Sequence, residues 1–307
     1  MKAVICEKYG PPEVLKLRDI PKPVPRSNEI LVKVKATAVN SGDVRMRGLQ
    51  ANLFLRTMMR FIIGFRGPRN SVLGGVLSGT VEHTGGNVTR FKPGDNIFAM
   101  TGMKFGGYAE YAVLKESGAI ALMPATATFE QAAVLPFGGS TALYFLRKAG
   151  VEDTPGQNVL IYGASGAVGT AAIQVATHFG ARVTAVCSGQ SAELVKSLGA
   201  DQVIDYTTQD FLQSNEKYDI IFDAVGKISK KDCSTLLTNN GKYVTVGSMD
   251  VANELSSDLE LLATLYDTNK FHAVIDRTYP LEQIVDAHTY VDQGHKHGNV
   301  AITVSHK

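Results

Sequence analysis

The chain has 307 residues, of which 44% are hydrophobic, and its mean hydropathy is close to zero. This length is sufficient for two domains, and the composition is that of an ordinary globular protein, not of a disordered chain. The formal charge of +2 and the pI near 8.3 lie far below the basic excess of a dedicated nucleic-acid-binding protein, so nucleic acid is not an expected partner.

The first residues, MKAVICEKYG, turn polar before they could form the apolar core of a signal peptide. No later segment approaches the ~20 apolar residues that span a bilayer. The sequence therefore predicts a cytoplasmic protein without a membrane span. Cys6, Cys187 and Cys233 are too few and too scattered for a disulfide framework or a CxxC metal site, and we expect buried, reduced thiols.

Short, valine-rich runs separated by Pro, Gly and Asn predict β-structure in the first third of the chain. These runs cover residues 2–10, 29–40, 77–85, 95–100 and 108–114. They indicate a barrel-like or sandwich module.

Residues 45–70 form an insert that is rich in Arg and Met and contains no carboxylate. Three interpretations are open. The insert is a helix packed on its own domain with its arginines in solvent, a mobile flap over an apolar substrate, or an amphipathic helix on a membrane surface.

From Asn158 onward, apolar runs of strand length alternate with helical patterns. Strands are expected at 158–163, 182–187, 202–205, 218–226 and 242–247, and helices at 167–180, 191–199, 208–214 and 229–240. This alternation predicts a parallel sheet covered by helices on both faces. After Gly247 we expect a helix over 252–270, a strand over 271–277, a helix over 281–293 and a strand over 299–304, with the closing strands rejoining the first module.

The stretch IYGASGAVGT follows the first of these strands and opens the first of these helices. Ala164, Gly166 and Gly169 match the pattern G-x-G-x-x-[GA] of a dinucleotide-binding turn, and Ser165, Ala167 and Val168 complete it. Gly166 would leave room for a pyrophosphate on the helix N-terminus, and Gly169 would let the helix pack closely on its strand. The alternative is a tight turn that binds nothing.

The identity of the cofactor should show about 20 residues later, where NAD-dependent proteins carry an Asp or Glu for the ribose 2′-hydroxyl. Here the second strand ends in AVCSGQS, with Ser188 and no carboxylate. A 2′-phosphate would meet no repulsion there and could accept hydrogen bonds from Ser188 and the neighbouring backbone. The sequence therefore favours NADPH, with Lys196 and Tyr206 as additional candidate contacts.

Several motifs in order along the chain carry a family resemblance. They are GDVRMRG, RFKPGD and GGYAEY, followed by PFGGSTALYFL, GASGAVG, SLGADQVIDY and FDAVG. With them the chain resembles the zinc-independent quinone oxidoreductase branch of the medium-chain dehydrogenase/reductase superfamily, over nearly its whole length. The resemblance implies an α/β fold with two domains: a GroES-like β-barrel catalytic domain (1–123 plus 272–307) and a doubly wound Rossmann NADP-binding domain (124–271), with the active site in the cleft between them.

The resemblance also bears on metal binding. The zinc-dependent branch supplies its catalytic ligands from a CGTD-like turn and a GHE motif, where this chain has NSGD at 40–43 and GGVLSG at 74–79. These residues cannot hold tetrahedral zinc, so we expect a protein without zinc. His295 and His297, in a glycine-flanked turn without a third ligand, are expected to be solvated turn residues.

The resemblance places Asn40 beside the nicotinamide and the substrate, where its amide could donate to a developing oxyanion. The alternative for Asn40 is a turn residue that satisfies its own backbone. Thr141 matches the family position near the nicotinamide, with ordinary helix capping as a compatible role. Asp43 and Tyr108 are candidate proton donors, with solvent as the other source. Further cofactor contacts are expected at Val225, Gly247 and Asn299.

The implied activity is NADPH-dependent reduction of a small quinone or α,β-unsaturated carbonyl compound by hydride transfer. The alternatives are a reductase of simple ketones or aldehydes and a low-turnover NADPH-binding sensor protein. After Gly247 the chain passes almost directly to the next helix, so we expect five parallel strands where family members have six. The family's dimers use that edge of the sheet, and a homodimer of this chain therefore remains an open question.

Overall fold

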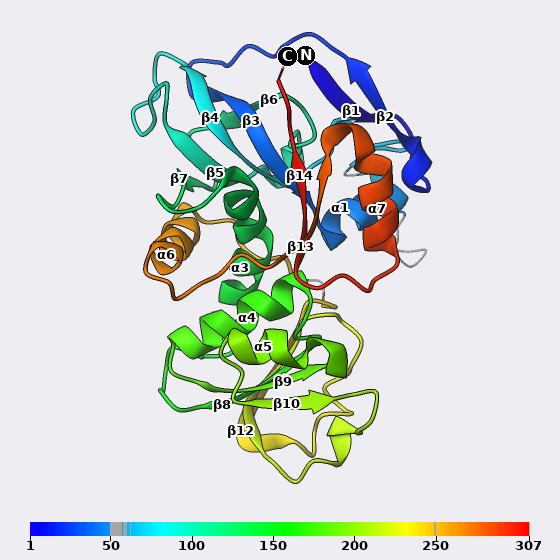
Figure 1. The fold of residues 1–307 in the computed structure, drawn as a ribbon, viewed down its shortest axis with the longest axis vertical. Coiled ribbons are helices and arrows are strands. Elements are labelled where there is room, and N and C mark those ends of the chain that lie inside the picture. Colours follow the sequence, from blue (N-terminus) through cyan, green and yellow to red (C-terminus); the bar gives the residue numbers. More distant parts are fainter. Residues whose placement is uncertain (50–56, 58–59, 62, 249, 307) are drawn as a thin grey trace. The chain divides into compact units, whose positions relative to one another are not determined.

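The computed structural model describes residues 1–49, 57, 60, 61, 63–248 and 250–306. The chain divides into two compact units (Figure 1). Unit 1 comprises Met1–Phe137, Glu254–Thr264 and Ile275–Lys307, and unit 2 comprises Gly138–Asn253 and Leu265–Val274. This division assigns residues 124–137 and 254–264 to unit 1, whereas the sequence analysis expected them in the cofactor domain. The domain boundaries at 123/124 and 271/272 stay a prediction.

Unit 1 contains a seven-stranded sheet in the order β13-β14-β3-β4-β5-β7, with β6 paired to β3, and a separate hairpin of β1 and β2. The strands are β1 Lys2–Cys6, β2 Leu15–Asp19, β3 Glu29–Val39, β4 Val76–Thr84, β5 Asn96–Met100, β6 Tyr111–Lys115, β7 Ile120–Leu122, β13 Ile275–Pro280 and β14 Asn299–Thr303. The five strands expected in the first third are present, and β2 and β7 are additional. β14 pairs antiparallel with β3, which confirms that the chain returns to its first module.

The long strand β3 organises the core of unit 1. Val32, Val34, Val300, Ile302 and Ile284 are all buried in one apolar cluster that joins β3, β14 and α7 (Ile284–Asp292). β-Branched side chains fit the pleated surface of a strand and pack well across it, which explains why this valine-rich run forms the centre of the sheet.

Unit 1 contains further helical segments besides α7. They are α1 Ser41–Gly48, η1 Pro12–Val14, η2 Gly102–Lys104 and η5 Leu281–Gln283, which leads into α7. Figure 1 shows α7 beside α1, and the two helices are in contact. Because a single residue, Asn40, separates the end of β3 from the start of α1, the strand fixes where the first turn of this helix lies. Part of the 45–70 insert, at 50–56, 58–59 and 62, lies outside the described residues.

Unit 2 contains a five-stranded parallel sheet in the order β10-β9-β8-β11-β12, as the sequence predicts. Its strands are β8 Asn158–Tyr162, β9 Arg182–Cys187, β10 Gln202–Asp205, β11 Tyr218–Asp223 and β12 Leu237–Thr245. The helices α4 Ala167–His178 and α5 Ala192–Ser197 form the crossovers on one face, and η3 Gly189–Ser191 and η4 Phe211–Gln213 are short turns. The helices α3 Phe129–Lys148 and α6 Ser256–Asp267 each continue from unit 1.

Two helices expected from the sequence in this unit are wrong. Residues 208–214 contain only η4, and residues 229–240 form turns that lead into β12. At Ser229 the side chain donates to Asp232 Oδ2 (2.6 Å) and accepts from the Asp232 backbone N–H (3.2 Å). Such local bonds give the backbone an alternative to a helix. Cys233 is buried by this arrangement, and all three cysteines are free and buried, as expected.

In the part of the chain that the structure describes, no helix is long and apolar enough to cross a membrane.

Candidate active site

The glycine turn of unit 2 has the geometry that the sequence predicts. Gly163 follows β8 with φ +76°, a conformation that favours glycine. Gly166 is the N-cap of α4 and has extended backbone angles. Ala164, Ala167 and Val168 are buried beneath the turn. The turn thus directs the first N–H groups of a twelve-residue helix to the carboxyl edge of the sheet.

Gly166 and Gly169 have different steric surroundings. A Cβ at Gly169 would lie 2.2 Å from the Gly163 carbonyl oxygen and 2.6 Å from Ala164 Cα, so this glycine is required by close packing of the helix on the turn. A Cβ at Gly166 would have only one neighbour, the Gly163 oxygen at 3.7 Å. Space is therefore open at Gly166, where a pyrophosphate is expected.

The loop that follows β11 also approaches this turn, at the point where the strand order reverses between β8 and β11. A Cβ at Gly163 would lie 1.9 Å from Val225 Cγ2. The loop is held by Asp223, which is fully buried and whose Oδ1 accepts the N–H groups of Val225 (3.0 Å) and Gly226 (2.8 Å). A Cβ at Gly226 would lie 2.8 Å from Gly247 Cα, so Val225 and Gly247 border the same edge.

The start of α3 within unit 2 approaches the glycine turn as well. A Cβ at Gly138 would lie 2.4 Å from the carbonyl oxygen of Ala167, the first residue of α4. Thr141 lies one turn further along α3 and is half-buried. Ser140 is 1% exposed, and its Oγ has no hydrogen-bond partner among the described residues.

The other predicted cofactor contacts surround the end of β9. Ser188 caps η3 and lies 3.4 Å (Oγ to Oγ) from Ser191. Lys196 Nζ lies 3.8 Å from Glu193 Oε1, with a largely exposed side chain. Tyr206 is 52% exposed and donates its backbone N–H to Cys187 O.

The sequence analysis overlooked Asp205 in this region. It ends β10, pairs in register with Cys187, and its Oδ2 would lie 2.5 Å from a Cβ at Gly189. Hydrogen bonds from Thr207 hold the pKa of Asp205 below its usual value. A carboxylate is therefore present beside Ser188, although it comes from the neighbouring strand.

These features fit a dinucleotide cofactor. The open space at Gly166, the helix N-terminus behind it and the orphaned hydroxyl of Ser140 lie around the switch point of a parallel sheet, where such ligands bind. Gly166, Ala167 and Val168 would hold the diphosphate through their backbone N–H groups.

In unit 1, Asn40 is the N-cap of α1. Its Oδ1 accepts the Asp43 N–H (3.0 Å), and Asp43 Oδ2 accepts the Asn40 N–H (3.1 Å), which makes a reciprocal capping box. Because Oδ1 must face a donor, the amide orientation is fixed and Nδ2 points away from the cap. Within the described part of the chain, Nδ2 has no recorded hydrogen-bond acceptor.

Asp43 is 2% exposed and is almost enclosed by donors. Its Oδ1 accepts the Gly75 N–H (3.0 Å), and the Tyr108 hydroxyl interacts with the carboxylate and favours its charged form. Burial raises the pKa of Asp43 to about 6, although these hydrogen bonds oppose the shift.

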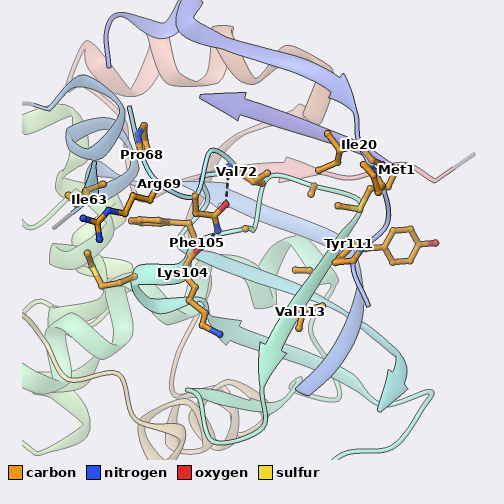
Figure 2. Close-up of a pocket in the computed structure, with 17 residues that line it drawn as sticks. Met1, Ile20, Ile63, Pro68, Arg69, Val72, Lys104, Phe105, Tyr111 and Val113 are labelled. Carbon is orange, nitrogen blue, oxygen red and sulfur yellow. Dashed lines mark hydrogen bonds between the residues drawn. The ribbon is translucent and has the colours of Figure 1, made fainter. Parts of the chain in front are cut away.

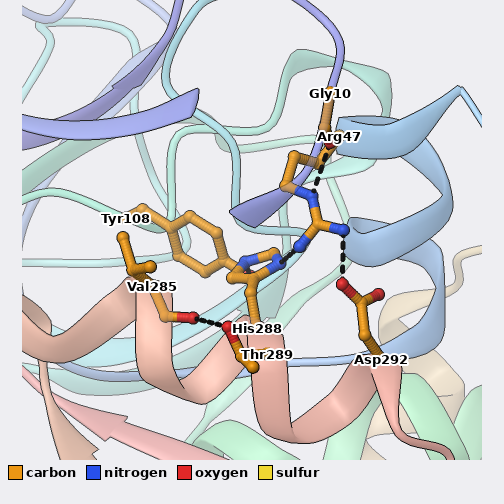
Figure 3. Close-up of polar contacts among 7 residues, drawn as sticks. All are labelled: Gly10, Arg47, Tyr108, Val285, His288, Thr289 and Asp292. Atoms are coloured by element: carbon orange, nitrogen blue, oxygen red, sulfur yellow. Dashed lines mark hydrogen bonds and ion pairs between the residues drawn. The ribbon is translucent and has the colours of Figure 1, made fainter. Parts of the chain in front are cut away.

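Behind Asp43 lies a chain of buried polar side chains (Figure 3). The Tyr108 hydroxyl lies 3.2 Å from His288 Nε2, and His288 Nδ1 lies 3.2 Å from an Arg47 guanidinium nitrogen. Arg47 continues to Asp292 Oδ2 at 2.7 Å. The sequence analysis did not single out Arg47 or His288. The available signal was a histidine on the apolar face of α7, four residues after Ile284 and three before Val291.

Asn299 begins β14 and is 8% exposed. The antiparallel register pairs Val300 with Val39, so Asn299 lies next to Asn40 one step further along. The structure therefore brings Asn40, Asp43 and Asn299 together in unit 1, and the glycine turn, Thr141, Val225 and Gly247 together in unit 2.

Unit 1 also contains a cavity of about 550 Å³ with mainly apolar walls (Figure 2). Ile63, Pro68, Arg69 and Asn70, at the described end of the insert, contribute to its lining. Val72 and Phe105 also line it.

The comparisons with known proteins agree with this geometry. The family model described as "Alcohol dehydrogenase GroES-like domain" matches residues 26–125, and the one described as "Zinc-binding dehydrogenase" matches residues 167–276. The "2-methylene-furan-3-one reductase" of Solanum lycopersicum is 33% identical over 98% of this chain and 79% of its own length. The chain belongs to the quinone oxidoreductase branch of the medium-chain dehydrogenase/reductase superfamily.

Two further relatives of this branch are informative. The "NADPH-dependent alkenal/one oxidoreductase, chloroplastic" of Arabidopsis thaliana is 32% identical over 98% of this chain and 79% of its own length. The solved structure of the quinone oxidoreductase from Coxiella burnetii has a TM-score of 0.89 and 30% identity, and 99% of each chain is covered. The fold expected from the sequence, a GroES-like domain with a Rossmann domain, is thereby confirmed, and the homologues support an oxidoreductase with a nicotinamide cofactor.

In this member of the quinone oxidoreductase branch, the side chains at the zinc positions do not fit the metal. Asn40 replaces a thiolate, and residues 74–79 contain no His or Glu. Among the residues that the structure describes, no three His, Cys, Asp or Glu side chains are grouped as metal ligands. His295 is exposed, and the His297 N–H donates to Asp276.

Proposed function

We propose that this protein is an NADPH-dependent, zinc-independent reductase that transfers a hydride to a quinone or an α,β-unsaturated carbonyl compound. The names of its relatives support both substrate types. Asn40 carries the proposal, because the cap that holds its Oδ1 leaves Nδ2 as an oriented donor for a carbonyl oxygen that gains negative charge.

The two units have separate tasks in this reaction. Unit 2 holds the cofactor through the backbone of Gly166, Ala167 and Val168, with Thr141 and Val225 as contacts to the nicotinamide end. The bound nicotinamide supplies the hydride. Unit 1 supplies the Asn40 amide, with Asn299 beside it, in place of the Lewis acid that zinc provides in related dehydrogenases. Both oxygens of Asp43 are occupied by donors, so solvent is the proposed source of the proton.

The preference for NADPH over NADH is the finer part of the proposal. Ser188, just before η3, offers a hydrogen bond to a 2′-phosphate, and Lys196 and Tyr206 lie on the elements that flank it. Asp205 opposes this preference electrostatically, which makes its substitution informative.

The apolar cavity supports the flap interpretation of the insert. Ile63 and Pro68 are buried and line the cavity together with the exposed Arg69 and Asn70, so the described end of the insert borders apolar space. We propose that residues 63–70 of this insert flank the apolar body of the substrate. The homodimer and the cytoplasmic location stay predictions.

The test of the activity is the oxidation of NADPH by the purified protein with 1,4-benzoquinone, a medium-chain enone and a simple ketone as acceptors. A parallel NADH series and a chelator control accompany it. We expect turnover with the first two acceptors that is insensitive to chelator and faster with NADPH. Turnover of the simple ketone alone would favour the ketone-reductase alternative, and tight NADPH binding without turnover would favour the sensor alternative.

The role of Asn40 can be separated from its capping role by two variants. Asn40→Ser keeps a good N-cap for α1 but removes the amide donor, whereas Asn40→Ala removes both. We expect kcat to fall by about 100-fold in both variants, the cost of losing an oxyanion donor. Only Asn40→Ala should also lose stability, by about 1 kcal/mol. Wild-type kcat in Asn40→Ser would contradict the proposed role.

A further inference from the structure

We propose that His288 is a positioning residue for the Asn40–Asp43 turn and acts on it through Tyr108. This inference deepens the proposed function and rests on it, because the turn carries the amide that polarises the substrate carbonyl. Three observations support it: the direction of the hydrogen bonds, the anchoring of the chain at its far end, and the burial of Tyr108, His288 and Arg47.

The direction of the hydrogen bonds follows from Arg47. A guanidinium group only donates, so the contact of 3.2 Å between Arg47 and His288 Nδ1 requires Nδ1 to accept. The single proton of the neutral imidazole is then on Nε2, which lies 3.2 Å from the Tyr108 hydroxyl and donates to it. The contact with Arg47 thus selects the tautomer of His288.

Tyr108 connects His288 to the Asn40–Asp43 turn, and the hydrogen bond from His288 determines where the Tyr108 hydroxyl proton points. Since its hydroxyl oxygen accepts from His288, its own proton is directed to the other side, where it donates to the Ala38 carbonyl oxygen (3.4 Å) at the end of β3 and interacts with the Asp43 carboxylate. Asp43 in turn accepts the Asn40 and Gly75 N–H groups. The chain of donors therefore leads to the end of β3, two residues before Asn40, and to the carboxylate that completes the capping box of Asn40.

The far end of the chain is anchored. Arg47 Nε donates to Gly10 O at 3.1 Å, and its other terminal nitrogen pairs with Asp292 at 2.7 Å (Figure 3). The Arg47 side chain is 2% exposed and that of Asp292 is 26% exposed. With its donors directed to fixed acceptors from three segments, the guanidinium cannot turn away from His288.

Burial keeps the chain in one protonation state. His288 and Tyr108 are 0% exposed. Burial and the Arg47 charge lower the pKa of His288 to about 3, so the ring stays neutral and cannot reverse the direction of donation. Asp43 is the member of the chain that titrates nearest to neutral pH, with a pKa of about 6.

The groups that face Asp43 determine what the loss of His288 would do. Tyr108 is the titratable side chain that interacts with Asp43. The positive charge of Arg47 lies one turn further along α1, where the carboxylate of Asp292 balances it and the Cys6 thiol also faces it. Because the interaction with the Tyr108 hydroxyl lowers the pKa of Asp43, misdirecting that hydroxyl should raise it. The capping box should then open at a higher pH than in the wild type.

The experiment compares His288→Leu, which removes both hydrogen bonds, with His288→Gln, which can accept from Arg47 and donate to Tyr108. Tyr108→Phe breaks the same link with little change in packing. The matched control is Thr289→Ala on α7, because the Thr289 hydroxyl bonds only to the Val285 carbonyl in the described contacts. The readouts are kcat, KM for NADPH, the acid limb of the pH profile of kcat, and the carbon-13 titration of the Asp43 carboxyl.

We expect His288→Leu and Tyr108→Phe to lower kcat by about 10-fold or more, because a misplaced donor loses orientation, while KM for NADPH is unchanged. In both, the acid limb and the Asp43 titration should move to higher pH, whereas His288→Gln and Thr289→Ala should resemble the wild type. Destabilisation alone would lower the folded fraction without moving the titration of the Asp43 carboxyl in the folded protein.

Folded Tyr108→Phe with the wild-type kcat and the wild-type Asp43 titration would overturn the inference. A wild-type protein without turnover on any acceptor would instead refute the proposed function. In that case the carbon-13 titration still tests whether His288 acts on Asp43, because it needs no substrate.

Discussion

The two candidate half-sites are built in different ways. The glycine turn of unit 2 is made from backbone that lies within a few residues of Gly166, and its contacts are steric. The Asn40 turn of unit 1 depends on side chains that are distant in sequence: Arg47 and His288 are separated by 241 positions. A phosphate site made from backbone can therefore be recognised from a short motif, whereas an oriented side-chain donor requires a tertiary network behind it.

This difference predicts how each half-site fails. Substitutions in the glycine turn should act through shape, either on the fold or on the cofactor, and should depend little on pH. Substitutions behind Asn40 should act through hydrogen-bond direction and charge, so their effects should depend on pH.

The largest effect is expected for Gly169→Ala. The added Cβ would lie 2.2 Å from the Gly163 carbonyl oxygen, and backbone atoms of the turn must move to admit it. We expect a loss of about 3 kcal/mol in the free energy of unfolding, which outweighs the ~1 kcal/mol that alanine gains over glycine in a helix. Urea unfolding measures it. In the control Gly86→Ala, no atom lies within 4 Å of the new Cβ, and its stability should stay near that of the wild type. Equal stabilities for the two variants would contradict the steric argument.

Gly166→Val should separate cofactor binding from folding. The nearest atom lies 3.7 Å from a Cβ at this position, so the first carbon of the new side chain fits the protein and the branched side chain occupies the space expected for the pyrophosphate. We expect the Kd for NADPH to rise about 100-fold, with a loss of about 1 kcal/mol in stability from the poorer N-cap. Fluorescence titration of NADPH and urea unfolding of the same sample are the measurements. Unchanged affinity would show that the diphosphate does not bind over Gly166.

The sequence predicted the fold where the pattern repeats. The five parallel strands, the helices after β8 and β9 and the returning strand β14 were recognisable because their apolar periods continue over whole elements. The errors came where side chains bond locally, as Ser229 and Asp232 do in the turns before β12. The short strands β2 and β7 are defined by their partners in the sheet, which a single sequence does not show.

For the candidate site, the sequence predicted the positions but not their supports. Asn40 and the glycine turn were identified from local motifs and the family resemblance. The bonds that orient Asn40 come from Tyr108 and His288, and the carboxylate of Asp205 reaches Gly189 from the adjacent strand. Such partners become visible only when strand order and helix packing are known.

His288→Gln sharpens the comparison through the pH dependence of stability. The pKa of His288 is lowered from 6.5 to about 3 in the folded protein, so the unfolded chain binds a proton first as pH falls. The free energy of unfolding contributed by His288 is therefore lost progressively below about pH 6.5. Asp43 acts in the opposite direction, because its pKa is raised from 3.8 to about 6 and the folded protein binds its proton first.

In the wild type these two dependences oppose each other between about pH 6 and pH 4. The His288→Gln substitution removes the pH dependence that comes from His288 and leaves the one that comes from Asp43. As the pH is lowered through this window, the free energy of unfolding of the wild type minus that of the variant should therefore decrease, by about 1.4 kcal/mol for each pH unit. Urea unfolding at about pH 6, 5 and 4 measures this difference. A difference independent of pH would mean that His288 is not held neutral.

The smallest effect is expected for Asp205→Asn, and it tests whether charge at the end of β10 influences the choice of cofactor. Asparagine keeps an oxygen that can accept from Thr207 but removes the negative charge beside Ser188 and Gly189. Because the carboxylate is solvated, its repulsion of a 2′-phosphate is screened, and we expect the preference for NADPH over NADH to rise by only about threefold, less at high salt.

Asp201→Asn is the matched control, since it removes the same charge just before the other end of β10, where Asp201 accepts the Val183 N–H. The measurement is the ratio of kcat/KM for the two cofactors at low and high ionic strength. If both variants shift the ratio equally, the effect belongs to net charge, and the position of Asp205 has no special role. If only Asp205→Asn shifts the ratio, a side chain from the neighbouring strand modifies the cofactor preference that Ser188 suggests. The candidate cofactor site of unit 2, although built mainly from backbone, would then also depend on one electrostatic contact from a residue outside the glycine turn.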